Sequence, residues 1–225
     1  MARIQKTSAA EWIPASHDLR ALHDAARSCE GCDLFRHATQ VVFGAGPQKA
    51  KVVFIGEQPG NDEDLKGLPF VGPAGRLLNK GLDDAGIDRE IVYVTNAVKH
   101  FKFVERGKRR IHAKPTGIEI SSCRPWLEAE LAAIRPELVV CLGATAAQSL
   151  MGRDFRITVN RGRFFPHQWA KELMATIHPS AILRMEPDRR EAEYALFVED
   201  LRGAAAKMRE IEKSASANVH RASSG

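Results

Sequence analysis

Short apolar runs alternate with amphipathic segments along most of the chain. Four runs have the length and apolar content typical of buried strands: KVVFIGE (51–57), IVYVTNAV (91–98), ELVVCLG (137–143) and ELMATIH (172–178). Helical spacing marks the segments 75–86, 118–134, 144–151 and 187–211, and Pro125 is expected to kink or end the second of these. Strands alternating with helices predict a three-layer α/β/α fold around a central, mostly parallel, four-stranded sheet.

The composition indicates how far this fold extends. The chain has 225 residues, of which 44% are apolar, and this suits one globular domain with a substantial core. We expect that domain to span residues 1–212. The last residues, 213–225 (KSASANVHRASSG), are small and polar and are predicted to form a disordered tail.

The N-terminus, MARIQKTSAAEWIP, lacks the apolar run of a signal peptide. No apolar run approaches the roughly 18 residues that a membrane helix needs. We therefore expect a cytoplasmic protein without membrane contact, in a compartment where disulfides rarely persist.

Polar residues follow each of the four predicted strands. They lie in GEQPG (56–60), NAVKHFK (96–102), GATAA (143–147) and HPSAIL (178–183). In sheets of this kind ligands bind beyond the carboxyl ends of the strands, so these segments are expected to converge. The stretch GAGP (44–47) precedes its strand and lacks a third glycine, which excludes a dinucleotide site.

The positive charge is concentrated in one segment. The net charge is +5, from 33 Lys and Arg against 28 Asp and Glu. Residues 99–114 (KHFKFVERGKRRIHAK) carry seven Lys or Arg and one Glu, so the rest of the chain is close to neutral. A solvated charge run is one interpretation. The apolar Phe101, Phe103 and Ile111 between the bases favour a site for a polyanion such as nucleic acid.

Four cysteines form a second pattern. Cys29 and Cys32 are spaced C-x-x-C, and Cys123 and Cys141 lie 18 positions apart. A redox pair with two buried thiols is possible, although a redox C-x-x-C normally follows a strand. Four thiolates also suit zinc or a 4Fe–4S cluster, and spacing does not choose between them. A metal site would fix the N-terminal segment to the sheet domain.

Together these motifs resemble the uracil-DNA glycosylase superfamily, and within it the iron–sulfur class called family four. The resemblance rests on GEQPG, GLPFVGPAGRLL (67–78), VTNAVKHFK (94–102), the cysteines and HPSAILR (178–184), and spans about Cys29 to Leu201. The segment GKRRIHAKP (107–115) resembles the KRRIH loop of the UdgX branch. Membership implies a 4Fe–4S cluster on Cys29, Cys32, Cys123 and Cys141. It also implies uracil-containing DNA as the partner, with single strands favoured. One loop-rimmed cleft needs no symmetry partner, so we expect a monomer.

The resemblance assigns roles to the residues that would hold uracil. Phe70 would stack on the flipped base, and Gln58 would lie in the uracil pocket. Asn96 would accept from N3–H and donate to O4, a pattern that cytosine reverses. His178 would donate to O2 as the glycosidic bond breaks. Each has a simpler interpretation: core packing for Phe70, a strand-end turn for Asn96 and a backbone-bonded ring for His178.

The resemblance also predicts what His112 does. Its neutral imidazole would attack deoxyribose C1′ and leave the protein covalently attached to DNA, after one turnover. The motif lacks the Asp that positions water in other classes. Glu57 would orient this nucleophile and contribute by stabilising positive charge on the sugar, and holding off the 5-methyl of thymine is a further alternative. The basic residues Lys102, Lys108, Arg109 and Arg110 would bind phosphates, and Arg110 could also hold the loop against the domain. The alternatives are a water-using glycosylase that turns over, and a protein that binds uracil or damaged DNA without cutting it.

Overall fold

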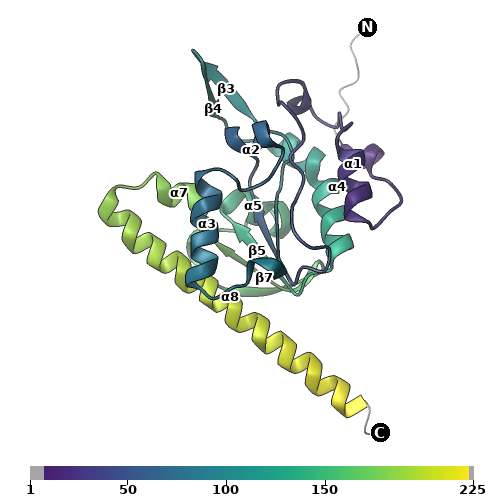
Figure 1. Cartoon of the computed structure of the whole chain (residues 1–225), viewed down its shortest axis with the longest axis vertical. Helices are drawn as coiled ribbons and strands as arrows, with labels where there is room; N and C mark the ends of the chain where they lie inside the picture. The colour runs from purple at the N-terminus through teal and green to yellow at the C-terminus, as the bar shows by residue number, and fades with distance from the viewer. Residues whose placement is uncertain (1–7, 223–225) are drawn as a thin grey trace.

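The sheet at the centre of the molecule has five strands. The computed structural model describes residues 8–222 (Figure 1). The strand order is β2 (Val92–Asn96), β1 (Val52–Gly56), β5 (Leu138–Leu142), β7 (Ala170–Thr176) and β6 (Phe164–His167). The first four are parallel and are the four runs predicted from sequence. The sheet is therefore mostly parallel, as expected.

The predicted count of four strands is wrong, because β6 adds an antiparallel edge to β7. Its sequence, FFPH, contains Pro166, which argues against a strand because proline cannot donate to a ladder. An edge strand needs donors on one side only, and the β6–β7 register shifts between Phe165 and His167, on either side of the proline. Edge position is a property of the fold, so a local pattern does not show it.

Helices cover both faces of the sheet, and alternate strand residues point to each. Phe54 and Val140 pack in the core beneath α3 (Pro73–Asp84), α7 (Pro179–Leu183) and α8 (Pro187–Ala222). Ile55 and Cys141 pack on the other face, beneath α4 (Gly117–Ile134), α5 (Ala144–Met151) and α6 (Ile157–Asn160). Figure 1 shows α3 and α8 on one side of the sheet and α4 on the other. The three-layer prediction is confirmed.

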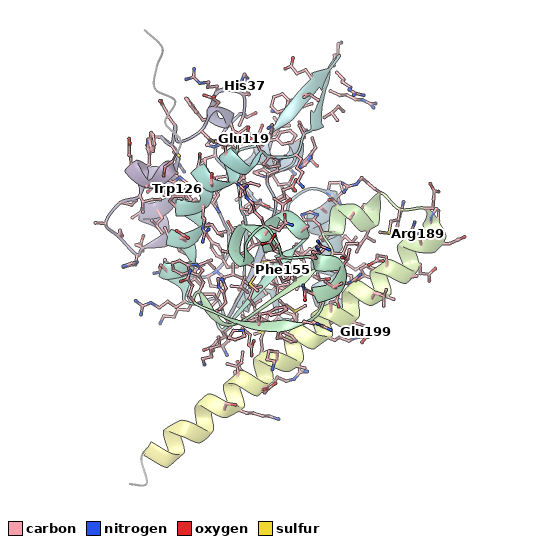
Figure 2. All side chains as sticks on the ribbon, turned by 180° about the vertical axis from the view of Figure 1, so that it is seen from behind. His37, Glu119, Trp126, Phe155, Arg189 and Glu199 are labelled. Atoms are coloured by element: carbon pink, nitrogen blue, oxygen red, sulfur yellow. The ribbon has the colours of Figure 1, made fainter. Side chains whose placement is uncertain are left out.

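The N-terminal segment packs on the outer side of α4. It consists of η1 (Ala9–Trp12), α1 (Leu19–Ala26) and η2 (Asp33–Arg36). Trp126 of α4 is fully buried in this layer, with its ring edge against Phe43. Figure 2, seen from behind, shows Trp126 next to these helices. The segment therefore has a small core of its own, separate from the sheet.

The helices α4 and α8 differ from the boundaries predicted for them. α4 continues through Pro125, so the proline does not mark a boundary. A capping box begins this helix: Thr116 accepts from the Glu119 N–H, and Glu119 accepts from the Thr116 N–H at 2.6 Å. α8 continues to Ala222, past residue 212, while residues 1–7 and 223–225 lie outside the described part. The division into domain and tail stays a prediction.

The basic segment forms a two-stranded ribbon where the sequence suggested a loop. β3 (Phe103–Arg106) pairs with β4 (Arg109–His112), with Phe103 opposite His112, and Gly107 has a φ of +59° in the turn. Two shorter helical elements, α2 (Asn61–Lys66) and η3 (Arg89–Ile91), complete the structure. The ribbon projects from the body above α2 (Figure 1). None of the helices between residues 8 and 222 is long and apolar enough to cross a bilayer.

Candidate active site and cysteine cavity

A cleft of about 1280 Å³ opens at the carboxyl ends of the parallel strands. Six of the residues predicted from sequence line it: Glu57, Gln58, Phe70, Asn96, His112 and His178. They come from five different segments, and the strand-end rule brings them together. The four predicted phosphate-binding residues lie outside this lining, along the ribbon and at its base.

Gly56, the last residue of β1, pairs with Asn96 of β2 and lies beneath the side chains that form the floor of the cleft. A β-carbon built on Gly56 would lie 2.3 Å from Asn96 Oδ1, 2.9 Å from Phe70 Cζ and 3.4 Å from His178 Nε2. The three predicted uracil contacts therefore surround one point. Asn96 is 3% exposed, and within residues 8–222 no other group hydrogen-bonds to its side-chain amide. Such an amide is expected to bind a ligand.

The backbone of Phe70 is strained, with a φ of +56°. The first turn of α3 explains how this strain is held, because a β-carbon on Gly75 would lie 1.8 Å from the Phe70 carbonyl oxygen. Glu63 fixes the flanking turns by accepting from the backbone N–H of Gly72 at 2.7 Å and of Gly60 at 3.1 Å. Strain supported in this way is typical of ligand clamps. Sequence reasoning missed Glu63.

His178 caps the N-terminus of α7. Its Nδ1 accepts from the Ser180 N–H at 3.1 Å, so the proton of the neutral ring is on Nε2, the atom near Gly56. Burial lowers its pKa to about 4, and the nearby Arg184 and His112 lower it further in the same direction. At neutral pH the ring is thus an uncharged donor that faces the cleft.

His112 ends β4 with its side chain half exposed. Gln58 Nε2 lies 2.9 Å from His112 Nε2. The Gln58 orientation is set by the ribbon: its Oε1 accepts from the Lys102 N–H, and its Nε2 donates to the Ala113 carbonyl. Gln58 therefore donates to His112 Nε2, which keeps a lone pair there. Burial lowers the His112 pKa and Arg184 adds to this, although Glu57 opposes it. The ring is a neutral base at pH 7.

Glu57 lies between the ribbon and the sheet. One carboxylate oxygen, Oε1, is 3.6 Å from His112 Nε2, and the other accepts from the hydroxyl of Thr145 at 2.5 Å. Thr145 lies in the first turn of α5, after the strand β5. Sequence reasoning missed Thr145, although GATAA was expected to reach this edge of the sheet.

Arg110 fixes the ribbon to the body. Its guanidinium donates to Asp64 at 2.6 Å and to Asn61 at 2.9 Å, both on α2, and it lies 5.0 Å from the ring centre of Phe103. Asp64 is fully buried, so this ion pair is shielded from solvent. The Arg110 guanidinium is thus bound by α2, which agrees with the expectation that it holds this segment against the domain.

The other three basic residues differ in exposure. Lys102 pairs with Glu119 at 2.8 Å and is partly buried. Lys108 and Arg109 are exposed at the tip of the ribbon. Lys108 and Arg109 are therefore accessible to a phosphate backbone. Phosphate binding by Lys102 stays a prediction.

Three of the four cysteines share a small cavity between α4 and the N-terminal segment. Cys29, Cys32 and Cys123 line it together with His100 and Lys99. Burial raises the pKa of Cys32 to about 11 and of Cys123 to about 12, and the nearby Lys99 only partly offsets this effect at Cys123. Among residues 8–222, no three His, Cys, Asp or Glu side chains are arranged to hold a single metal ion.

The fourth cysteine, Cys141, lies elsewhere. It is fully buried on β5, paired with Ile55 of β1 and Ala175 of β7. It packs in the core between the sheet and the α4–α5 layer, whereas Cys123 points to the outer side of α4. The predicted set of four cysteines is therefore not brought together by the structure.

A buried ion pair connects the cysteine cavity with the floor of the cleft. Lys99 contacts Glu130, and both side chains are at most 1% exposed. Lys99 also donates to the Thr95 hydroxyl at 2.6 Å and to the Asn96 carbonyl at 2.8 Å. Tyr93 donates to Glu130 at 2.8 Å, and burial beside this carboxylate raises the Tyr93 pKa well above its ordinary value. The pair holds the end of β2 in place.

Known proteins resemble this chain in sequence and in fold. A Type-4 uracil-DNA glycosylase of Archaeoglobus fulgidus is 40% identical over 186 residues, which are 78% of this chain and 89% of that protein. One of Thermotoga maritima is 37% identical over 169 residues, 74% of this chain and 83% of that protein. The crystal structure of wild-type Pedobacter heparinus SMUG2 matches 70% of this chain and 77% of its own with a TM-score of 0.50, at 13% identity. That likeness supports the fold alone.

The family model described as the Uracil DNA glycosylase superfamily matches residues 43–202, from Phe43 through the cleft to the middle of α8. The matched range contains the five strands of the central sheet and the six predicted residues that line the cleft. The chain therefore belongs to the uracil-DNA glycosylase superfamily.

Proposed function

We propose that this protein excises uracil from DNA and then remains covalently attached to the deoxyribose through His112. The observation that carries the proposal is the floor of the cleft. Asn96, Phe70 and His178 surround the missing β-carbon of Gly56, and His112 lines the same cleft. One cleft thus offers a base pocket and a nucleophile on its rim.

The base pocket suits a flipped uracil. Asn96 can accept from N3–H and donate to O4, and these are the two edge groups that cytosine presents in reverse. Phe70 offers a ring face for stacking, and its ring lies 6.2 Å from that of His178 at an interplanar angle of 26°. Gly56 lets these three side chains approach one another, because a β-carbon there would clash with Asn96 Oδ1 at 2.3 Å.

Breaking of the glycosidic bond leaves negative charge on uracil, and His178 can stabilise this charge. The Nε2–H of a neutral ring donates to O2 without first taking up a proton, which its low pKa would oppose at neutral pH. The glycosidic electron pair departs with the base, and positive charge develops on the sugar. The carboxylate of Glu57 stabilises that charge.

His112 then bonds to C1′. Once uracil has left with the C1′–N1 electron pair, the lone pair on Nε2 forms the new bond to C1′, and the imidazolium so formed keeps its proton on Nδ1. Gln58 can release the ring at little cost. Its two amide hydrogens face three acceptors: the Lys102 and Ala113 carbonyls, at 3.2 and 2.9 Å, and His112 Nε2. Both hydrogens stay bonded after His112 moves.

The exposed tip of the ribbon would bind phosphates. Lys108 and Arg109 form no ion pair within the described residues, and each phosphate contact on duplex DNA should steepen the salt dependence of log K by roughly 0.9. A preference for single strands follows from the cost of flipping a paired base. The UdgX branch, the cytoplasmic location and the monomeric state stay predictions.

The test is His112→Ser, with Lys108→Ser as the matched control on the same ribbon. Each variant is incubated with a single-stranded oligonucleotide that contains one uracil, and free uracil and a heat-stable protein–DNA band are measured. We expect His112→Ser to release uracil and lose the band, because water fills the vacated space. Lys108→Ser should keep both, with a weaker salt dependence.

The results separate the alternatives. A band that persists in His112→Ser would assign the bond to another residue. A wild type that releases uracil repeatedly without a band would show a glycosylase that uses water. A wild type that binds the oligonucleotide without releasing uracil would show a binding protein.

A further inference from the structure

We infer that His100, not Cys141, is the fourth ligand of a 4Fe–4S cluster held by Cys29, Cys32 and Cys123. The inference rests on the further proposal, made here from the resemblance to iron–sulfur glycosylases, that this chain carries such a cluster. We derive the ligand set from the chain's own side chains around the cysteine cavity.

The position of Cys141 excludes it. Residues 139 and 141 of β5 point to the same face of the sheet, where Cys141 contacts the core under α4 and α5. Cys123 lies on the opposite side of α4, in the core of the N-terminal segment. The body of α4 therefore separates the two thiols. A move of Cys141 to the cavity would break the pairing of β5 with both β1 and β7.

His100 lies where a fourth ligand is needed. It lines the cavity with the three thiols and is only 7% exposed. Over residues 8–222 its ring makes no hydrogen bond, which is unusual for a buried imidazole. Its neighbour Lys99 donates a backbone N–H to Cys123 Sγ at 3.2 Å, so this stretch of chain is fixed beside the thiol.

The chemistry of the donor set fits a cluster better than a single ion. In a 4Fe–4S cluster each terminal ligand binds a different iron, so the ligands stand farther apart than around one metal ion. The absence of a single-ion site among the described residues is consistent with this spacing. Imidazole also binds iron in clusters, and it raises the reduction potential where it replaces a thiolate, because it is neutral.

The turn that carries the first two thiols is built tightly. A β-carbon on Gly31, between Cys29 and Cys32, would lie 2.8 Å from the backbone of Ala9. The η1 segment thus closes over the C-x-x-C turn, and Ala9 itself lines the cavity. Together these contacts cover one side of the site, where Cys29 and Cys123 are buried and Cys32 is partly exposed.

The experiment compares His100→Ala, His100→Cys and Cys141→Ala, each purified without oxygen. Iron and acid-labile sulfide per chain, visible absorption and electron paramagnetic resonance are measured. We expect roughly four irons in the wild type and in Cys141→Ala. His100→Ala should lose about one iron or more, with a changed resonance signal, and His100→Cys should restore four irons at a lower reduction potential.

Full iron content and an unchanged spectrum in His100→Ala would overturn the inference, as would loss of the cluster in Cys141→Ala with the fold intact by circular dichroism. A wild type that holds zinc or no iron would overturn the cluster proposal as well. Restoration by His100→Cys separates ligation from a folding defect. None of these readouts depends on uracil excision, so the two proposals fail separately.

Discussion

The substitution Gly56→Ala tests the uracil pocket most directly. The new β-carbon would lie 2.3 Å from Asn96 Oδ1, while real β-carbons essentially never approach closer than 3.0 Å, so the amide must move by about 0.7 Å. It would also meet the edge of Phe70 at 2.9 Å, where the strained backbone leaves little freedom to retreat. The strand itself should tolerate alanine, since the pairing of Gly56 with Asn96 uses backbone groups.

A displacement of this size at a hydrogen-bonding group costs on the order of 100-fold in rate, or about 2.7 kcal/mol of transition-state stabilisation. We expect that loss in the single-turnover release of uracil from a single-stranded oligonucleotide. The control is Gly203→Ala, where the added β-carbon meets nothing within 4 Å on α8. Gly203→Ala should keep the wild-type rate and gain about 0.5–1 kcal/mol of stability.

The reasoning would be refuted if Gly56→Ala released uracil within about threefold of the wild-type rate. The base would then have to bind away from the point that Asn96, Phe70 and His178 surround. Thermal unfolding of both variants, followed by circular dichroism, shows whether the loss belongs to the pocket or to the fold.

Three further predictions concern the ribbon and the buried pair. Arg110→Met should keep uracil release but slow adduct formation at least about 10-fold, because the ribbon loses its contact with α2. Arg109→Met should not slow adduct formation, and equal effects in both variants would contradict the anchoring role. The rate of adduct formation should stay constant from high pH down to 6.5 and fall only below pH 6.5. The reason is that the pKa of His112 is lowered and only the neutral ring has a free lone pair on Nε2. A midpoint above 6.5 in a pH–rate profile would argue against this. Lys99→Met should lower the free energy of unfolding by about 3–5 kcal/mol, since Glu130 is left buried without its cation, and urea denaturation at neutral pH measures this loss.

The sequence allowed the sheet and the cleft to be predicted because both depend on local pattern. Apolar runs of four to six residues marked the four parallel strands, and the strand-end rule placed Asn96 and His178 in one cleft. The rule is topological, so it needs no side-chain detail. It could not show the peptide of Phe70 in a left-handed conformation, because the close approach of Gly75 that holds it is a tertiary contact.

The errors have physical reasons of the same kind. β6 was missed because Pro166 is excluded from central strands and tolerated on edges, and only the folded sheet has an edge. The ribbon was read as a loop because its strands, FVER and RRIH, show no apolar–polar alternation and half of their residues carry Arg or Glu charges. Cys141 could have been questioned from the sequence. It lies within the apolar run that predicted β5, two residues after Val139, and therefore faces the core.

The two ends of the ribbon are held very differently. At its root, next to His112, Gln58 hydrogen-bonds to the backbone of Lys102 and of Ala113, and farther along the ribbon Arg110 donates to the buried Asp64. At its tip, Lys108 and Arg109 are exposed. An isolated two-stranded ribbon is only marginally stable in water, so this one depends on its contacts with the body. The protein thereby keeps His112 beside the cleft and presents the two exposed bases of the tip to a DNA strand.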